Sequence, residues 1–155
     1  MNIINLREKT EDINTLARWH QDEWGYLNPN GNLQKRLDKM QMFLQTKFIP
    51  SMYIATDNQL LGSAACVEHD MDNRLDLSPW LASVYVSKTF RTQGIGSKLV
   101  QHVMDQARAH KIDTLYLFTP DQESFYARLG WQVLEETIYH GHAVTIMSVA
   151  LNQKD

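Results

Sequence analysis

Apolar residues recur at every third or fourth position in two stretches of the first fifty residues, and this spacing predicts two amphipathic helices. The first begins near Thr10 and carries Ile13, Leu16, Ala17, His20 and Trp24 on one face. The second carries Leu33, Leu37, Met40, Leu44 and Phe48, and Pro50 closes it. A short strand is expected at residues 2–6, and the Asn-Pro-Asn-Gly run at 28–31 separates the two helices.

Shorter apolar runs predict strands at residues 52–56, 60–68, 81–86, 113–118, 131–136 and 143–151. A long helix should follow Gly94 and reach about His110, because Ile95, Leu99, Val103 and Ala107 recur at a spacing of four. A short helix is expected at 121–129, and residues 69–79 read as a polar loop. This order of elements predicts an α/β protein of the α+β type, built on a mixed sheet.

Composition narrows the class of protein. A chain of 155 residues with 43% hydrophobic residues is the size of one domain, 1–155. The formal net charge of −3 argues against a nucleic-acid partner, and no apolar run approaches the roughly 20 residues of a membrane span. The first residues lack the apolar centre of a signal peptide, so a cytoplasmic protein is expected. Cys66 is the only cysteine, which excludes an intrachain disulfide and a cysteine zinc cluster.

The most informative segment joins the strand at 81–86 to the helix after Gly94 through Arg91-Thr92-Gln93-Gly94-Ile95-Gly96-Ser97. Backbone N–H groups at a helix N-terminus lack intrahelical partners and lie at the positive end of the helix dipole, so they stabilise an anion. Glycines at 94 and 96 let the main chain approach a ligand closely. The segment therefore predicts a phosphate-binding turn.

Two other phosphate-binding loops fit this segment less well. A dinucleotide fingerprint has a third glycine where this chain has Leu99, although Asp113 lies near the place of the ribose-binding acid. A nucleotide-triphosphate loop ends in Gly-Lys-Ser/Thr, whereas this chain reads Gly96-Ser97-Lys98. Both alternatives are rejected.

A second motif, Tyr126-Ala127-Arg128-Leu129-Gly130-Trp131, lies about 30 residues beyond the glycine turn. With the preceding strand, the Arg-x-x-Gly-x-Gly turn and the final hairpin, it resembles the GNAT superfamily of acetyl-CoA-dependent N-acyltransferases over nearly the whole chain. The resemblance implies a central mixed sheet of about six to seven strands, with splayed central strands and about four helices.

The resemblance also implies acetyl-CoA as cofactor. Its pyrophosphate would be received by the backbone amides of Gln93, Gly94, Ile95, Gly96 and Ser97, and its pantetheine arm would pair with the backbone of Val84 and Val86 as a missing strand would. Tyr85, Arg91 and Thr92 complete the expected cofactor site. Many members of the family carry an asparagine seven residues before the tyrosine, where this chain has Thr119, so contacts around the pantetheine would differ in detail.

Acetyl transfer to an amine needs a deprotonated nitrogen, a polarised thioester carbonyl and a proton donor for the departing thiolate. The expected acid is Tyr126, and a backbone N–H near Val86 is expected to face the thioester oxygen. Glu68 is the first choice for the general base, because it ends a strand that neighbours the cofactor strand in the family. His69 and Asp76 are the alternatives.

The acceptor is expected to be a primary amine of a small molecule or of a protein. Its site is predicted to include Trp24, Tyr26, His69, Trp80 and His140. His140 and His142 share one face of a strand, but no third ligand lies near them in the sequence, so no metal is predicted. The oligomeric state stays open, a homodimer being one option. The competing function is a non-catalytic acyl-CoA-binding regulatory module.

Overall fold

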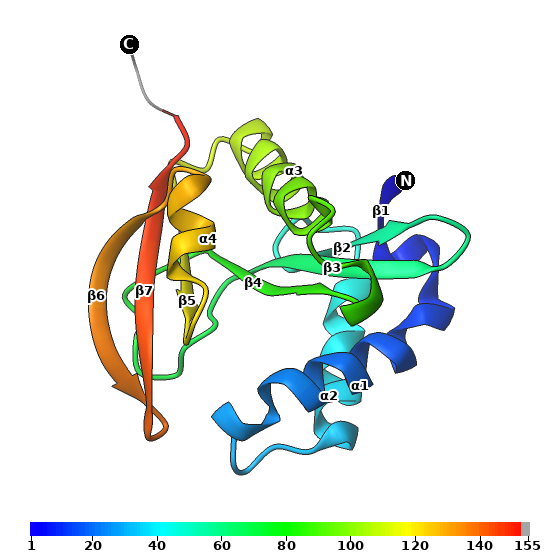
Figure 1. Cartoon of the computed structure of the whole chain (residues 1–155), viewed down its shortest axis with the longest axis horizontal. Coiled ribbons are helices and arrows are strands. Elements are labelled where there is room, and N and C mark those ends of the chain that lie inside the picture. Colours follow the sequence, from blue (N-terminus) through cyan, green and yellow to red (C-terminus); the bar gives the residue numbers. More distant parts are fainter. Residues whose placement is uncertain (153–155) are drawn as a thin grey trace.

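A computed structural model describes residues 1–152, which form a seven-stranded mixed sheet in the order β1-β2-β3-β4-β5-β7-β6 (Figure 1). The strands are β1 (Asn2–Asn5), β2 (Ser51–Thr56), β3 (Leu60–Val67), β4 (Trp80–Val86), β5 (Thr114–Thr119), β6 (Gln132–Tyr139) and β7 (His142–Ala150). The α-helices are α1 (Ile13–Trp24), α2 (Leu33–Met40), α3 (Ile95–Ala109) and α4 (Glu123–Arg128). The expected mixed sheet of about six to seven strands is confirmed.

The sheet separates two hydrophobic cores. On one face α3 and α4 pack their apolar sides, and Leu99, Val103 and Tyr126 belong to this core. On the other face lie α1 and α2 (Figure 1), whose Leu16 and Met40 pack with strand residues of that face. The predicted spacing of four on α3 holds, because Ile95, Leu99, Val103 and Ala107 are all buried.

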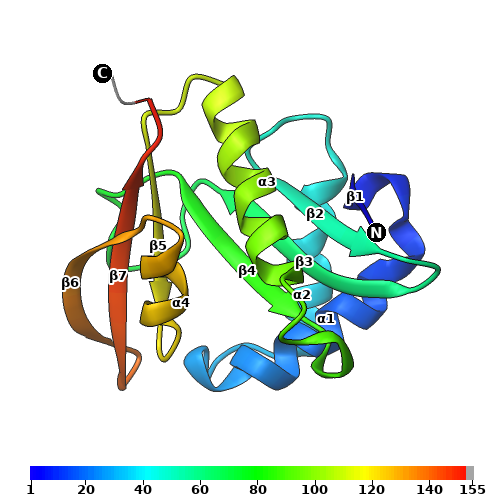
Figure 2. The ribbon, with the colours of Figure 1, turned by 45° about the horizontal axis from the view of Figure 1, so that its top comes forward.

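Strands β4 and β5 diverge, and this determines where a site can form. They are parallel and paired at a single position, Trp80 with Tyr116, after which their ribbons move apart (Figure 2). The divergence coincides with a β-bulge, because Ala64 of β3 faces two residues of β4, Ser83 and Val84. A bulge bends its strand and increases the local twist. The splayed central strands implied by the family resemblance are therefore present.

One predicted helix ends early. The sequence predicted a helix over 33–48, but α2 ends at Met40 and the chain continues as the 3₁₀ helix η4 (Gln41–Leu44) and an irregular segment. The apolar spacing predicted too long a helix because the apolar residues of this repeat pack in two different hydrophobic cores. Leu33, Leu37 and Leu44 pack with the core under α1, whereas Phe48 packs with the core on the α3 face, where its ring stacks on His110 at 4.4 Å. A single straight helix cannot reach both faces of the sheet.

The other predicted elements agree with the structure to within a few residues. β6 runs on to Tyr139, three residues beyond its predicted end, and a two-residue turn leads into β7. The turn residues His140 and Gly141 both have positive φ, as a tight hairpin turn requires. No helix within residues 1–152 has the length and apolarity needed to cross a bilayer.

Candidate active site

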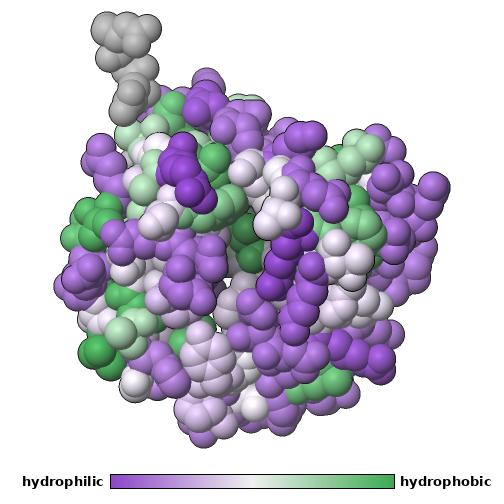
Figure 3. Space-filling model, in the orientation of Figure 1, coloured by the Kyte–Doolittle hydropathy of each residue, from purple (hydrophilic) through white to green (hydrophobic). Residues whose placement is uncertain are grey.

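A cavity of about 610 Å³ occupies the place where β4 and β5 diverge. Its walls come from the end of α1, from β4, from the glycine turn and first turn of α3, and from β5 and α4. The space-filling surface is hollowed near its centre, where the ribbons of the two halves of the sheet separate in Figure 1 (Figure 3). Because β5 is not paired with β4 beyond Tyr116, the backbone of β4 borders this cavity directly.

The glycine turn forms one end of the cavity. Gly94 has a φ of 81° and immediately precedes α3, and no side chain caps this end of the helix. A Cβ at Gly96 would lie 3.4 Å from Phe125 Cζ and 3.5 Å from Val86 Cγ2, so any side chain there would fill part of the cavity. The uncapped amides and the space above Gly96 fit a phosphate-bearing ligand. Of the residues expected here, Arg91, Thr92, Gly94, Ile95, Gly96 and Ser97 line the cavity and Gln93 does not.

The open edge of β4 follows from its hydrogen bonds. The Ser87 N–H donates to Leu61 of β3 at 2.8 Å. Because backbone groups alternate in direction along a strand, the N–H and C=O of Val84 and Val86 point the other way, toward the missing partner. Both residues and Tyr85 line the cavity. An extended chain lying there would meet the N–H and C=O of Val84 and the N–H of Val86, whereas the Val86 C=O already accepts a hydrogen bond from Arg91.

Arg91 lies beside the C-terminal end of β4, where three contacts fix its side chain. Its Nε donates to the Val86 carbonyl at 2.9 Å, its guanidinium lies 5.3 Å from the centre of the Tyr85 ring, and Nη2 lies 3.9 Å from Glu23 of α1. Arg91 therefore ties the end of β4 to α1 while its charge remains on the cavity wall.

A buried relay stabilises the bulge in β4. The Ser63 hydroxyl donates to the Ser83 carbonyl at 2.8 Å and lies 2.9 Å from His20 Nε2. Since the hydroxyl proton goes to the carbonyl, His20 Nε2 must carry the proton that it donates to Ser63. Burial, and to a smaller extent Arg36, lower the pKa of His20 to about 3, so its ring is neutral. Ser83 has a φ of 53°, and this relay helps to hold that uncommon conformation.

Tyr126 projects from α4 into the cavity wall and is only 8% exposed. Burial, together with the nearby carboxyl groups of Asp70 and Asp121, raises the pKa of Tyr126 well above its usual value. Its phenol is therefore protonated throughout the physiological range. Thr119, at the position where many relatives carry asparagine, also lines the cavity, and its hydroxyl accepts the Gln122 N–H at 2.9 Å.

The sequence did not indicate the carboxyl group that faces Tyr126. Asp70, in the loop after β3, lines the same cavity as Tyr126. Burial raises the pKa of Asp70 to about 6, against the opposing effects of Lys39 and Arg36. A carboxyl group with this pKa is ionised at neutral pH and can accept a proton from a bound amine.

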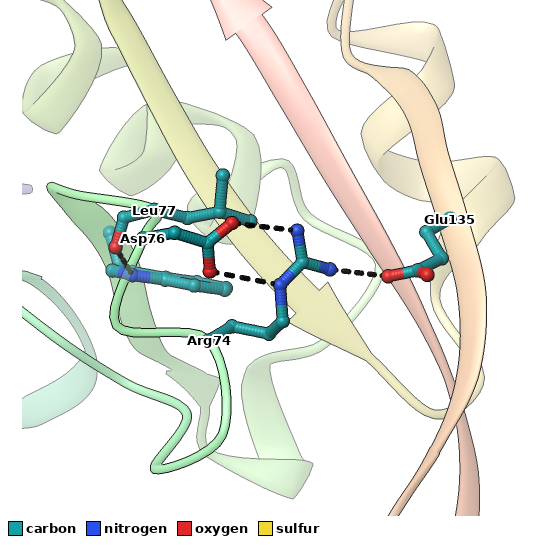
Figure 4. Close-up of polar contacts among 5 residues, drawn as sticks. Arg74, Asp76, Leu77 and Glu135 are labelled. Carbon is teal, nitrogen blue, oxygen red and sulfur yellow. Dashed lines mark hydrogen bonds and ion pairs between the residues drawn. The ribbon is translucent and has the colours of Figure 1, made fainter.

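The structure places the expected bases elsewhere. The Glu68 side chain is 76% exposed, lies 3.7 Å from His69 and does not line the cavity. His69 lines a separate cavity of about 440 Å³, which Asp70 also borders. Asp76 is engaged twice by the Arg74 guanidinium, at 3.0 and 3.1 Å, and Arg74 also binds Glu135 of β6 (Figure 4). These bonds lower the pKa of Asp76 and attach the β3–β4 loop to β6.

Of the aromatic residues expected at the acceptor site, only one lines the main cavity. Trp24 lines the main cavity and packs edge-on against Tyr85. Trp80 is fully buried, because its ring belongs to the core under α1 and its Nε1 donates to Leu77 at 2.7 Å. Tyr26 is 50% exposed and packs edge-on against His142 rather than lining the cavity.

His140 borders a further cavity of about 530 Å³ and links the β6–β7 turn to the 3₁₀ helix η3 (Gly25–Leu27) and to the β3–β4 loop. Its Nδ1 lies 2.5 Å from the Leu27 carbonyl and its Nε2 lies 2.8 Å from Asp72. These two hydrogen bonds raise the pKa of His140. Within residues 1–152 no group of three or more His, Cys, Asp or Glu side chains is placed to hold a metal ion.

Several lining residues carry no sequence signal. Arg36 of α2 borders all of these cavities, and Phe125 and Arg128 of α4 border the main one. Their spacing on the helices is that of ordinary partly exposed positions. A polar loop such as 69–79 does not show which of its carboxylates turns inward.

Comparison with known proteins agrees with this geometry. Residues 50–133 match the family model described as acetyltransferase (GNAT) domain. No curated protein sequence matches the chain significantly. Among solved structures, an aminoglycoside 6'-N-acetyltransferase complexed with coenzyme A aligns with a TM-score of 0.77 at 14% identity, covering 100% of this chain and 99% of its own. The ribosomal-protein-alanine N-acetyltransferase from Brucella melitensis aligns with a TM-score of 0.73 at 16% identity, covering 97% and 100%.

At these identities the structural neighbours establish a shared fold. The family model covers more than half of the chain, from β2 to the first residues of β6, and includes the bulged strand, the glycine turn and Tyr126. The chain therefore belongs to the GNAT family of acetyltransferases.

Proposed function

We propose that this protein is an N-acetyltransferase that transfers the acetyl group of acetyl-CoA to a primary amine of a small molecule or protein. One observation carries the proposal: the unpaired edge of β4 leads to an uncapped helix N-terminus within the same cavity that holds Tyr126 and Asp70. An acyl-CoA has this combination of an extended amide-containing arm and a pyrophosphate. The structural neighbour complexed with coenzyme A supports this ligand.

The residues present can bind and orient such a cofactor. The first amides of α3 would receive the pyrophosphate, and Val84 and Val86 would pair with the arm. Acetyl-CoA supplies an activated acetyl thioester when bound. The Val86 N–H, which points into the cavity, is the proposed donor to the thioester oxygen as negative charge develops there.

The proposed base is Asp70 rather than the expected Glu68, because Asp70 lines the cavity and Glu68 does not. The ionised Asp70 carboxylate takes a proton from the incoming ammonium group, directly or through a water, and leaves the nitrogen lone pair free to attack the carbonyl carbon. The Tyr126 hydroxyl then donates its proton to the departing sulfur, and the second proton that the acetylated nitrogen loses returns to the Tyr126 phenolate, directly or through a water. The raised pKa of Tyr126 keeps the phenol protonated while the thioester is attacked, so that its hydroxyl can donate a hydrogen bond to the sulfur as negative charge develops there.

Positioning contributes as well as proton transfer. Holding the amine and the thioester in one cavity replaces a bimolecular encounter and can lower a barrier by roughly 7 to 11 kcal/mol in favourable cases. The buried relay through Ser63 serves this purpose, because it supports the bulge from which Val84 and Val86 face the cavity.

The test is to incubate the purified protein with acetyl-CoA and a panel of primary amines while following free thiol. Amine-dependent thiol release is expected. Tyr126→Phe should lower kcat by about 100-fold, a typical contribution of general acid catalysis, with CoA affinity nearly unchanged. Tyr116→Phe is the matched control, because Tyr116 is a partly buried tyrosine of β5 outside the cavity.

Tight CoA binding without thiol release from any amine would instead identify a non-catalytic acyl-CoA-binding module. Unchanged turnover in Tyr126→Phe would remove the acid role from this residue while leaving the acetyltransferase function in place.

A further inference from the structure

The cavities of this protein meet at one arginine. Arg36 of α2 borders the main cavity, the cavity beside His140 and the cavity beside His69. It is partly buried, and within residues 1–152 its side chain makes one hydrogen bond, from Nε to Gln21 Oε1 at 3.0 Å. No carboxylate of the described residues lies within 4.0 Å of its guanidinium. A partly buried cation in this setting has lost hydration without gaining a direct ion pair, although the more distant Asp70 carboxyl favours its charge.

The surroundings of Arg36 are unusually basic for this chain. The 530 Å³ cavity is bordered by Lys35, Arg36 and Lys39 and by a single carboxylate, Asp72. That carboxylate is already paired with His140 at 2.8 Å. The whole chain carries a formal charge of −3, so this local excess of positive charge does not reflect its composition.

The basic cavity opens beside the proposed reaction centre. Asn28 and Arg36 border both it and the main cavity, and Asp70 borders the main cavity. Arg36 is near enough to Asp70 to counteract the effect of burial on its pKa. A ligand whose amine approaches Asp70 can therefore extend past Arg36 into the basic cavity.

We propose that the acceptor is a primary amine that also carries an anionic group, a carboxylate or a phosphate, and that Arg36 and Lys39 bind this group. The inference rests on the acetyltransferase function proposed above. A guanidinium offers two parallel N–H donors that match the oxygens of either anion, and the flexible lysine adds a point charge. Asp70 binds the ammonium end, so the acceptor is recognised at both ends.

The experiment compares matched amines with and without the anion. The carboxylate arm uses β-alanine against β-alaninamide and 4-aminobutyrate against its amide, and the phosphate arm uses O-phosphoethanolamine against ethanolamine. In each pair kcat/KM is measured and corrected for the fraction of free amine. In at least one arm the wild type should prefer the anionic member by about tenfold or more, the value of one charge-assisted hydrogen bond. The arm with the larger ratio identifies the anion.

Variants locate the preference. Arg36→Gln should abolish it, Arg36→Lys should retain part of it, and Lys39→Gln should reduce it. Lys47→Gln is the matched control, because Lys47 is an exposed lysine outside these cavities. Removal of the Arg36 charge also shifts Asp70, but that shift affects both members of a pair equally, so the ratio isolates anion recognition. Thermal unfolding of each variant shows whether it is folded.

Each outcome decides the inference. Amines that react with no anionic preference in either arm, or a preference that survives in folded Arg36→Gln, would overturn it and leave the acetyltransferase function standing. Thiol release from none of the amines would overturn the function itself and the inference with it. A preference that Arg36→Gln abolishes, Lys39→Gln reduces and Lys47→Gln leaves intact supports both.

Discussion

The relay beneath the bulge in β4 gives the sharpest test of the energetics. Ser63 of β3 is fully buried, and its hydroxyl satisfies both the Ser83 carbonyl and the N–H of His20. Ser63→Ala removes one oxygen and leaves these two groups without a partner in a closed environment. An unsatisfied buried polar group costs about 1 to 3 kcal/mol. The substitution should therefore destabilise the protein by about 2 to 6 kcal/mol.

Ser51→Ala is the matched control. Ser51 of β2 is 1% exposed, but within residues 1–152 its hydroxyl makes no hydrogen bond of normal geometry. Loss of that hydroxyl should change stability by less than about 1 kcal/mol, because no partner is abandoned. The pair thus compares the same chemical deletion at two buried strand positions that differ in their hydrogen bonds.

The assay is denaturant and thermal unfolding followed by circular dichroism, with CoA titration by calorimetry as a second readout. At about 2 to 4 °C per kcal/mol for a chain of this size, Ser63→Ala should lower Tm by at least about 4 °C relative to wild type. Its CoA affinity should also fall, because Val84 and Val86 leave the bulge toward the cavity. Equal unfolding midpoints for the two variants would refute the reasoning.

Three further predictions follow from the site and the sheet. The kcat/KM of the wild type should rise with pH through the Asp70 pKa of about 6, because only the carboxylate accepts a proton, and an acid limb that persists unchanged in Asp70→Asn would exclude this base. In NMR titrations the His20 ring should remain neutral until about pH 3, whereas the His140 ring should titrate above pH 6.5. The contribution of His140 to the folding free energy is then fully present below pH 6.5 and is lost as the pH rises through the raised pKa of His140. Gly62→Ala should destabilise the protein by about 1 to 3 kcal/mol or more, because the new Cβ would lie 2.3 Å from a carbonyl oxygen of β4. Gly94→Ala should cost only about 1 kcal/mol, for its positive φ, because the new Cβ would enter open space. Equal unfolding free energies for the two variants would contradict this prediction.

Local patterns were sufficient to predict the strand, the glycine turn and the helix that border the cavity. The glycine turn and the start of α3 could be predicted because a helix N-terminus depends on residues within a few positions of it. The left-handed conformation of Gly94 and the buried spacing of Ile95, Leu99 and Val103 are consequences of the same short-range constraints. The position of Tyr126 on a short helix that ends before Gly130 is a further example.

Short-range patterns did not predict the position of residues that pack against segments far away in the sequence. The apolar repeat that begins at Leu33 continues to Phe48, but Phe48 crosses to the other face of the sheet, where it stacks on His110. Trp80 was expected at the acceptor site, yet its side chain is completely enclosed in the core under α1. Neither outcome could be inferred from neighbours in the chain.

The sequence by itself determined that a strand and a glycine turn would lead to a helix N-terminus without a side-chain cap, because those conformations depend on contacts between near neighbours. Only the tertiary structure decided which carboxylate would line the cavity. Glu68 and Asp70 belong to the same loop and have similar chemistry, but Asp70 faces the cavity shared by Arg36 and Tyr126, and Glu68 faces solvent. That difference depends on segments far apart in the sequence, because residues of α2, the β3–β4 loop and α4 line one cavity.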